Sequence, residues 1–331
     1  MMESIELQQL RTLYELSFPD RKEYVDYFFA NKATANNVVC RKLNGKIVSA
    51  LYLVEKTVAL RGARFRCPFI VAAATLPELR GKKLLEGVMS DAFLRIASAG
   101  RCFTILSPFR HEYYRKYGFE TYAYVDSFVV NGMGNAGVTA RLASARDLPA
   151  IKRVYDTFTA GKQGVVLRSE AAFSSQYEEW VADCCKVFLL QKNGETCGYL
   201  VVNDEGVQEF CADPQDLNGM QGLKGLKVEL QHGEKEGNMA RVVCPQPLLE
   251  NIVYDGDGTV CFRLLDSFLP ENSGTYLLQV KNRLGKLQRV QRAPDCVITA
   301  GEFARIVFGA AENPAFRKIL RKKETMCFDK F

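Results

Sequence analysis

The stretch from Phe69 to Ala99 constrains the fold of this chain more than any other part of the sequence. It begins with FIVAAAT, a short run of apolar and small residues that is typical of a buried strand. It ends with LLEGVMSDAFLRIASA, whose apolar residues recur at the period of an amphipathic helix, and Gly100 marks the helix end. The pattern therefore predicts a buried strand followed by a helix that packs one apolar face on a sheet.

A short basic loop, Arg80-Gly81-Lys82-Lys83, joins this strand to this helix. The glycine allows a tight turn and a close approach of the backbone to a ligand. The loop leads into a helix N-terminus, where unpaired N–H groups and the helix dipole favour a phosphate group. We interpret it as a candidate anion-binding site, although strand–loop–helix units are also common without one.

The composition indicates an ordinary globular protein. The 331 residues are 47% hydrophobic and 25% charged, which suits two or three domains of usual size. The net charge of +6 lacks the dense Lys/Arg clustering of nucleic-acid binders, and the basic run in residues 317–323 fits a solvated helix face. No stretch approaches the roughly 20 apolar residues of a membrane span. We expect neither nucleic acid nor membrane as a partner.

The cysteines and histidines show no metal-binding pattern. Eleven cysteines occur without a C-x-x-C spacing, and His111 and His232 are the only histidines. We therefore expect no metal. The odd number of cysteines suits reduced thiols, and the acidic, amphipathic N-terminus does not resemble a signal peptide, so we expect a cytoplasmic protein.

The first part of the chain predicts an α+β sheet covered by helices. Two helices precede three antiparallel strands, with hairpin turns at Asn44-Gly45 and near Arg61-Gly62. The helix of the opening stretch follows. After it we predict a strand at 102–107, a short helix at 111–117 and a strand at 122–130.

The rest of the chain divides into two further regions. A glycine-rich joint at 132–137 marks a boundary, and a helix, a helix and a hairpin then repeat the order of the first domain. Residues 204–238 give no clear assignment. From Met239 the pattern predicts strands, a helix capped by Thr299 and Glu302, and a last helix at 314–323. We predict three domains, at 1–135, 136–238 and 239–331.

The opening stretch resembles the acyl-CoA motif of the GNAT acetyltransferases. The match rests on the run VAAATLPELRGKKL, with Pro77, Arg80 and Gly81 in the family's positions. Glu78 replaces the usual Gln or Arg, and Lys83 replaces a small residue. The resemblance implies acetyl-CoA as co-substrate, bound by Val71, Ala72, Ala73, Arg80, Gly81, Lys82 and Lys83. The second domain lacks this loop, so we expect no second cofactor there.

The whole arrangement resembles one GNAT branch, the enhanced intracellular survival (Eis) acetyltransferases. The signs are EYYRKYGF at 112–119, DSFLPENSGTY at 266–276 and a terminal phenylalanine. The resemblance implies an N-terminal GNAT domain, a second, shortened GNAT-like domain and a C-terminal sterol-carrier-like domain. It also implies a closed homo-oligomer, a trimer or a hexamer.

The same resemblance implies an N-acetyltransferase that acts on an amine of an aminoglycoside, a polyamine or a lysine. In Eis-like proteins the general acid is a tyrosine four residues before the motif's glycine, which is Tyr114 here, with Tyr113 as the alternative. A phenol has an ordinary pKa near 10 and stays protonated at neutral pH. The terminal carboxylate, here that of Phe331, serves as general base, and His111 is the less favoured candidate.

Acidic and aromatic residues of the N-terminal helices are candidates for binding a cationic amine. We select Tyr24 and Asp26, with Asp20 and Glu23 beside them, since carboxylates attract a cation. Two alternatives to an enzyme remain open. The chain is then either a non-catalytic GNAT-like scaffold or a carrier of apolar ligands that uses the C-terminal domain.

Overall fold

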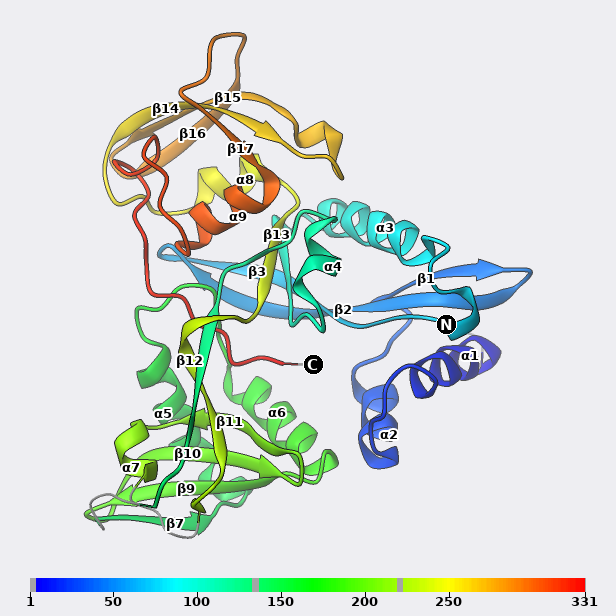
Figure 1. Ribbon diagram of the computed structural model, residues 1–331, viewed down its shortest axis with the longest axis vertical. Coiled ribbons are helices and arrows are strands. Elements are labelled where there is room, and N and C mark those ends of the chain that lie inside the picture. Colours follow the sequence, from blue (N-terminus) through cyan, green and yellow to red (C-terminus); the bar gives the residue numbers. More distant parts are fainter. Residues whose placement is uncertain (1–3, 133–136, 219–222, 331) are drawn as a thin grey trace.

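The computed structural model describes residues 4–132, 137–218 and 223–330, and Phe331 lies outside them. Figure 1 shows an elongated molecule with three parts. The first sheet crosses its middle, the C-terminal sheet lies at one end, and the second domain lies at the other. The chain is a mixed α+β protein with several separate sheets.

The first domain is built on the three predicted antiparallel strands. The hairpins turn at Asn44-Gly45 and Arg61-Gly62, where all four residues have positive φ. The sheet order is β1-β2-β3-β4-β13-β5. Its strands are β1 (Val38–Leu43), β2 (Lys46–Leu60), β3 (Ala63–Thr75), β4 (Phe103–Leu106), β13 (Met239–Val242) and β5 (Glu120–Thr121).

Helices cover both faces of this sheet. The helices α1 (Ser4–Glu15) and α2 (Lys22–Asn31) pack on one face through Leu10, Val25 and Phe28. The helix α3 (Leu84–Ser98) packs on the other face through the periodic apolar residues of the opening stretch, and α4 (His111–Arg115) lies on the same side.

The strand β13 reaches this sheet from a distant part of the sequence. It pairs antiparallel with β4 and with β5, although more than 100 residues separate it from either. The range 239–331 that we predict as the third domain therefore contributes one strand to the first sheet.

The second domain has its own four-stranded sheet, in the order β11-β10-β9-β7. Its two long helices and its hairpin follow the predicted order, while the residues 133–136 of the glycine-rich joint lie outside the described residues. Its elements are β7 (Val138–Leu142), α5 (Leu148–Thr159), β8 (Val165–Val166), α6 (Glu170–Ala182), β9 (Lys186–Lys192), β10 (Glu195–Asn203), β11 (Gly206–Cys211) and α7 (Pro214–Asn218).

Strand pairing ties the second domain to the first at two places among the described residues. The short strand β8 pairs with β2. A two-stranded ribbon of β6 (Tyr124–Val129) and β12 (Lys227–Glu236) runs between the domains (Figure 1). The unassigned stretch 204–238 thus contains β11, α7 and β12, apart from residues 219–222, which lie outside the described residues.

The C-terminal part is a sheet in the order β16-β15-β14-β17 with a filled core. The Phe262 ring stacks against Tyr276 and Phe303 at centroid distances of 5.5 and 5.8 Å, and Phe316 closes the group at 5.2 Å. The elements are α8 (Pro245–Asn251), β14 (Gly258–Leu265), β15 (Gly274–Lys281), β16 (Leu284–Arg289), β17 (Cys296–Thr299) and α9 (Ala300–Phe308).

The predicted last helix at 314–323 is wrong. Residues 314–319 form turns, and the backbone then bonds to distant partners instead of its own helix. Arg321 N–H donates to Asp255 Oδ2 at 2.8 Å, and Lys323 N–H donates to Gly309 O at 2.9 Å. Five cations within seven residues also repel one another at helical spacing, so the tertiary bonds prevail.

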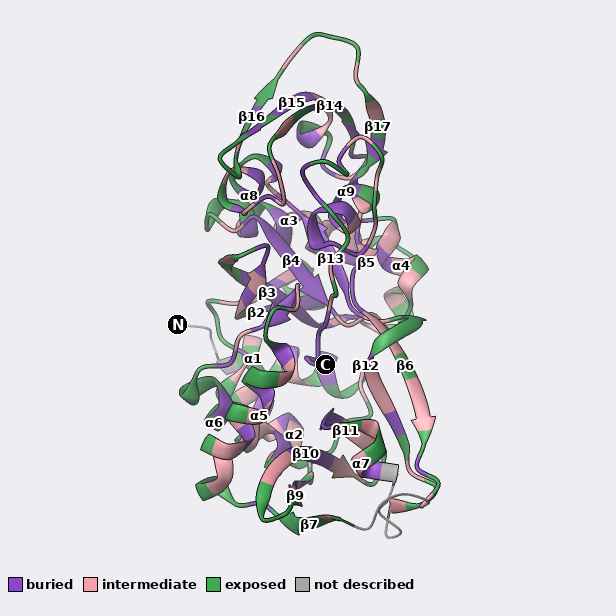
Figure 2. Ribbon diagram, turned by 90° about the vertical axis from the view of Figure 1, so that its left-hand side faces the viewer, coloured by how far each residue is buried: buried purple, intermediate pink, exposed green. Residues whose placement is uncertain are grey.

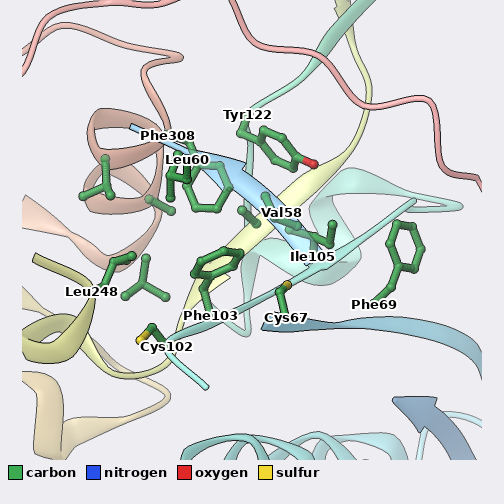
Figure 3. Packing of buried hydrophobic residues seen from close by; sticks show 14 of the residues in the cluster. Val58, Leu60, Cys67, Phe69, Cys102, Phe103, Ile105, Tyr122, Leu248 and Phe308 are labelled. Carbon is green, nitrogen blue, oxygen red and sulfur yellow. The ribbon is translucent and has the colours of Figure 1, made fainter. Parts of the chain in front are cut away.

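The first and C-terminal domains share one hydrophobic core. Phe308 of α9 packs on Phe103 and Tyr122 at centroid distances of 5.2 and 4.7 Å (Figure 3). The buried Arg61 at the β2–β3 turn adds a polar anchor, since its guanidinium donates to Asp255 and to the Val307 carbonyl. No helix among the described residues is long and apolar enough to cross a membrane.

Candidate functional site

A β-bulge interrupts the buried strand of the opening stretch. Ala50 pairs with Ala74 and Tyr52 pairs with Val71, so two residues of β3, Ala72 and Ala73, face one residue of β2. Ala72 adopts a φ of +49°. The strand β3 then pairs with β4 at one position, Phe69 with Ile105. Strands β3 and β4 therefore separate beside the bulge, and the backbone of Ala72 and Ala73 leaves the regular β2–β3 ladder, whereas Val71 still pairs with Tyr52.

The basic loop has the geometry of a site for an anion. Gly81 and Lys83 have φ of +80° and +58°, which turns the chain into the start of α3. The side chains of Arg80, Lys82 and Lys83 are exposed, and none of them forms an ion pair with another described residue. Arg80 Nε donates to Thr75 O at 3.3 Å. Three uncompensated cations therefore stand at a helix N-terminus.

Tyr114 lies on the opposite face of the first sheet from the helices α1 and α2. Only 5% of its surface is exposed, and it belongs to the cluster that also contains Ile70 of β3 and Leu106 of β4. Burial raises the pKa of Tyr114, with a smaller contribution from Tyr113. The neighbouring Tyr113 is half-buried, with Lys116 Nζ 4.0 Å from its ring centre.

His111 is engaged in a structural hydrogen bond. Its Nε2 lies 2.8 Å from Gly237 O, and a carbonyl oxygen only accepts, so Nε2 carries a proton and donates. This bond ties the start of α4 to the end of β12. It leaves only Nδ1 of this ring to act as a base.

A cavity of about 320 Å³ lies between α2, α6, the β10–β11 turn and the end of the chain. We call it the acidic pocket. Four aromatic side chains line it, namely Phe18, Tyr24, Trp180 and Phe328. Five carboxylates do so as well, namely Asp20, Glu179, Asp183, Glu205 and Glu209.

Two of these five carboxylates have cationic partners. Lys32 Nζ lies 2.6 Å from Glu179 Oε2, and Arg168 binds Glu209 with two bonds of 2.7 and 2.8 Å. The basic residues that also line the pocket, Arg21 and Lys330, pair with acids outside its wall.

The other three carboxylates leave the pocket with a net negative charge. Asp20, Asp183 and Glu205 form no ion pair with any described residue. Burial raises the pKa of Asp183, and the charges of Glu205 and Asp20 add to the shift, which indicates that these groups lie near one another. A cation is the ligand that such a site favours.

The predicted acceptor residues have different places. Tyr24 lines the acidic pocket, and its hydroxyl donates to Glu179 Oε1 at 3.1 Å. Asp26 is not among the lining residues, and its carboxylate pairs with Arg11 at 2.5 Å and with Lys22 at 2.6 Å.

Most of the pocket's acids come from the second domain and had no signal in the sequence. Glu179, Asp183, Glu205 and Glu209 belong to α6, to the residue after it and to the β10–β11 hairpin. In the sequence each one resembles an ordinary surface charge, and only the fold brings them next to α2. No group of three or more potential metal ligands occurs among the described residues.

A larger cavity of about 850 Å³ lies beyond Gln176, which lines both spaces. It is bounded by the β2–β3 hairpin and by the loop before β8, and its charged residues have both signs. It does not contain the surplus of acids that marks the acidic pocket.

Comparison with known proteins identifies the first domain. Residues 2–122 match the family model of the acetyltransferase (GNAT) domain. No curated protein matches the sequence.

Solved structures with the same fold cover nearly the whole chain. One is a conserved protein of unknown function from Enterococcus faecalis, a probable N-acyltransferase, with 15% identity, a TM-score of 0.81 and coverage of 100% of this chain and 98% of that one. A GCN5-related N-acetyltransferase from Anabaena variabilis has 15% identity, a TM-score of 0.76 and coverage of 99% and 98%. Eis1 from Mycobacterium abscessus has 13% identity, a TM-score of 0.71 and coverage of 100% and 99%.

Proposed function

We propose that this chain, whose residues 2–122 match the family model of the acetyltransferase (GNAT) domain, moves an acetyl group from acetyl-CoA to a cationic primary amine. The acidic pocket is the observation that carries the choice of acceptor. Its surplus of carboxylates attracts an ammonium group, and its aromatic side chains favour the same charge through their ring faces. Aminoglycosides, polyamines and lysine side chains share this chemistry.

The residues at the bulge and in the basic loop fit acetyl-CoA. The exposed cations Arg80, Lys82 and Lys83 suit its phosphates, and Gly81 permits the turn that exposes the loop backbone. The backbone of Val71, Ala72 and Ala73, at and beside the bulge, suits the pantetheine amides and can donate to the acetyl oxygen. Lys83 has an exposed side chain, so it supplies charge without filling the loop.

In the proposed reaction, residues on the two faces of the first sheet act together at the place where β3 and β4 separate. The neutral amine attacks the carbonyl carbon of the thioester, a C–N bond forms, and the C–S bond breaks. Tyr114 donates its proton to the leaving thiolate, since its raised pKa keeps the phenol protonated. The proton released by the amine passes to the carboxylate of Phe331, directly or through a water.

The role of Phe331 has its own test. Two glycines added after Phe331 move the carboxylate and leave the fold intact, so the acetylation rate should fall while acetyl-CoA still binds. A wild-type rate in the folded, extended protein contradicts the role. Phe331→Ala keeps a carboxylate and should remain partly active, and His111→Ala should remain nearly as active as the wild type.

Removal of carboxylate charges from the acidic pocket tests whether the acceptor is a cationic amine. In Asp183→Asn/Glu205→Gln the pocket loses two charges, each contributing about 1 kcal/mol to binding of a cation. The KM for a polyamine should therefore rise at least tenfold. Asp126→Asn, an exposed change on β6, serves as control. An unchanged KM in the double variant places the amine elsewhere.

The similarity to Eis-like acetyltransferases supports two further proposals, a closed homo-oligomer and a sterol-carrier-like C-terminal domain. Light scattering tests the first, and a monomer at micromolar concentration contradicts it. The rings of Phe262, Tyr276, Phe303 and Phe316 fill the core of the C-terminal domain, which speaks against a carrier of apolar ligands there. The melting temperature should rise with acetyl-CoA and stay unchanged with a fatty acid if the chain is an enzyme. The opposite result would indicate a carrier of apolar ligands.

A further inference from the structure

The end of the chain crosses from the C-terminal domain to the middle of the molecule and lies between the first and second domains (Figure 2). Its backbone is fixed there by hydrogen bonds. Gln163 N–H donates to Glu324 O at 2.9 Å, and Met326 N–H donates to Gln163 O at 3.0 Å. Farther along, the side chain of Asn238 donates to Asp329 O at 2.8 Å.

Asp329 is the point at which the tail meets both domains. Lys56 of β2 donates to Asp329 Oδ1 at 2.9 Å. Arg168, between β8 and α6, donates to Asp329 Oδ2 at 3.4 Å. The aspartate side chain is only 4% exposed. A buried acid of the tail is therefore bound by one cation from each domain, and we call these three residues the tail clamp.

The second domain holds its side of the clamp rigidly. Arg168 also forms a two-bond pair with Glu209, which accepts from the hydroxyl of Tyr199. The Arg168 guanidinium lies 4.4 Å from the Tyr155 ring centre. Two cations and two carboxylates balance here, so removal of Asp329 leaves one more cation than carboxylates, and Lys56 loses its partner.

The tail clamp stands at the wall of the acidic pocket. Phe328 and Lys330, the residues on either side of Asp329, both line that pocket. Lys56 and Arg168 line the larger cavity on the other side. The position of the clamp therefore sets where Phe328 and Lys330 meet the pocket.

We propose that Asp329 is a positioning residue for acetyl transfer, and that the second domain contributes to catalysis by supplying Arg168 to the tail clamp. The inference rests on the proposed function, because it assigns the clamp to a tail that carries the general base. Burial opposes ionisation of Asp329, but Lys56 and Arg168 lower its pKa to about 2. The clamp consequently stays charged through the neutral pH range.

A purely structural clamp and a positioning clamp give different kinetics. Loss of a structural clamp lowers the stability but leaves the rate of the folded protein unchanged. Loss of a positioning clamp lowers kcat while acetyl-CoA affinity stays the same, since displacement by about 1 Å costs up to roughly 100-fold in rate.

The test compares Asp329→Asn and Lys56→Gln with matched variants at a temperature where all are folded. Lys56→Arg keeps the cation, and Glu324→Gln removes an exposed tail carboxylate that pairs with Lys162. We expect kcat to fall 10- to 100-fold in the first two variants, with the Kd for acetyl-CoA unchanged by calorimetry. Lys56→Arg should keep at least half the rate, and Glu324→Gln should match the wild type. A kcat within twofold of the wild type in Asp329→Asn overturns the proposal.

The fluorescence of Trp180 reports whether the tail is held in place, and this measurement needs no acceptor amine. It is the single tryptophan of the chain, it is 5% exposed, and it belongs to the same packed cluster as Phe328. Acrylamide should quench its fluorescence more strongly in Asp329→Asn than in Glu324→Gln. Equal quenching overturns the clamp even if the enzyme is active. If the wild type acetylates no amine, the proposed function and the catalytic role of Asp329 fail together, while stronger quenching still supports tail fixation by the clamp.

Discussion

The hydroxyl of Tyr24 donates a hydrogen bond to Oε1 of Glu179 at 3.1 Å, across the boundary between the first and second domains. Glu179 also accepts from Lys32, so one carboxylate of α6 is bound by two residues from or next to α2. The two helices thereby form one wall of the acidic pocket. The acceptor site of the proposed reaction therefore requires both domains.

Tyr24→Phe tests this wall. The variant loses a hydrogen bond to a charged group, which costs about 1–3 kcal/mol of unfolding free energy. Because Glu179 is then held less firmly, the KM for a polyamine should rise several-fold, with kcat nearly unchanged. Denaturant unfolding and steady-state kinetics measure the two effects. A fall in kcat at constant KM would assign Tyr24 to the chemical step instead.

Gly81→Asp should abolish acetyl-CoA binding, because the new carboxylate repels the phosphates at the basic loop. Gly45→Asp is a matched control. Gly45 and Gly81 have φ of +77° and +80°, and an added Cβ meets no atom within 4 Å at either. Both variants carry the same backbone strain, and only one lies in the loop. If calorimetry shows that the two variants bind acetyl-CoA with equal affinity, the cofactor does not bind at this loop.

Tyr114→Phe should bind acetyl-CoA normally and acetylate about 10²–10⁴ times more slowly, since general-acid help has that size. Tyr113→Phe is the control. If only Tyr113→Phe loses acetylation activity, Tyr113 is the general acid and Tyr114 is not. The raised pKa of Tyr114 also has a consequence for pH. The group donates a proton only below its pKa, so the rate should not decline on account of Tyr114 until the pH exceeds about 10.

The helix that carries Tyr114 depends on the C-terminal half of the chain. The next glycine, Gly118, has a φ of +79°, and an added Cβ would lie 2.8 Å from the Arg241 guanidinium carbon. Arg241 of β13 binds Asp266, in the DSFLPENSGTY segment, at 2.6 Å. The glycine of the motif thus makes room for an arginine that joins two domains.

Gly118→Ala should therefore lower the unfolding free energy by about 2–4 kcal/mol, through strain and overlap together. Gly100→Ala is the control, because Gly100 also has a positive φ but its added Cβ meets nothing within 4 Å. It should cost only the backbone strain, about 1 kcal/mol. Equal losses in urea unfolding would show that Arg241 can move aside.

Most local parts of the fold followed from the sequence, apart from the helix predicted at 314–323, and the long-range parts did not. The strand–loop–helix stretch and the turns at Asn44-Gly45 and near Arg61-Gly62 depend on neighbouring residues, and the structure confirms them. The insertion of β13 beside β4 joins segments more than 100 residues apart. No periodicity signals such a pairing, so Met239 had no visible link to the first sheet.

The candidate site divides in the same way. The basic loop and Tyr114 stand in short motifs that a sequence displays. The carboxylate Asp183 and the clamp residues Arg168 and Asp329 lie in stretches without a motif, and they matter only because the second domain and the tail fold onto the first sheet. Asp26 looked as suitable as Tyr24 because the sequence did not reveal that Arg11 and Lys22 neutralise it.

Acetylation of a cationic amine with acetyl-CoA can be detected by the mass of its product. The most direct measurement is mass spectrometry of a mixture of polyamines, an aminoglycoside, a lysine peptide and neutral amines after incubation with protein and acetyl-CoA, beside Tyr114→Phe. We expect at least one cationic amine to gain the mass of one acetyl group, matched by release of free CoA thiol and nearly lost in Tyr114→Phe. The proposed function is contradicted if folded protein that binds acetyl-CoA transfers nothing to any cationic amine, or acetylates neutral amines equally well.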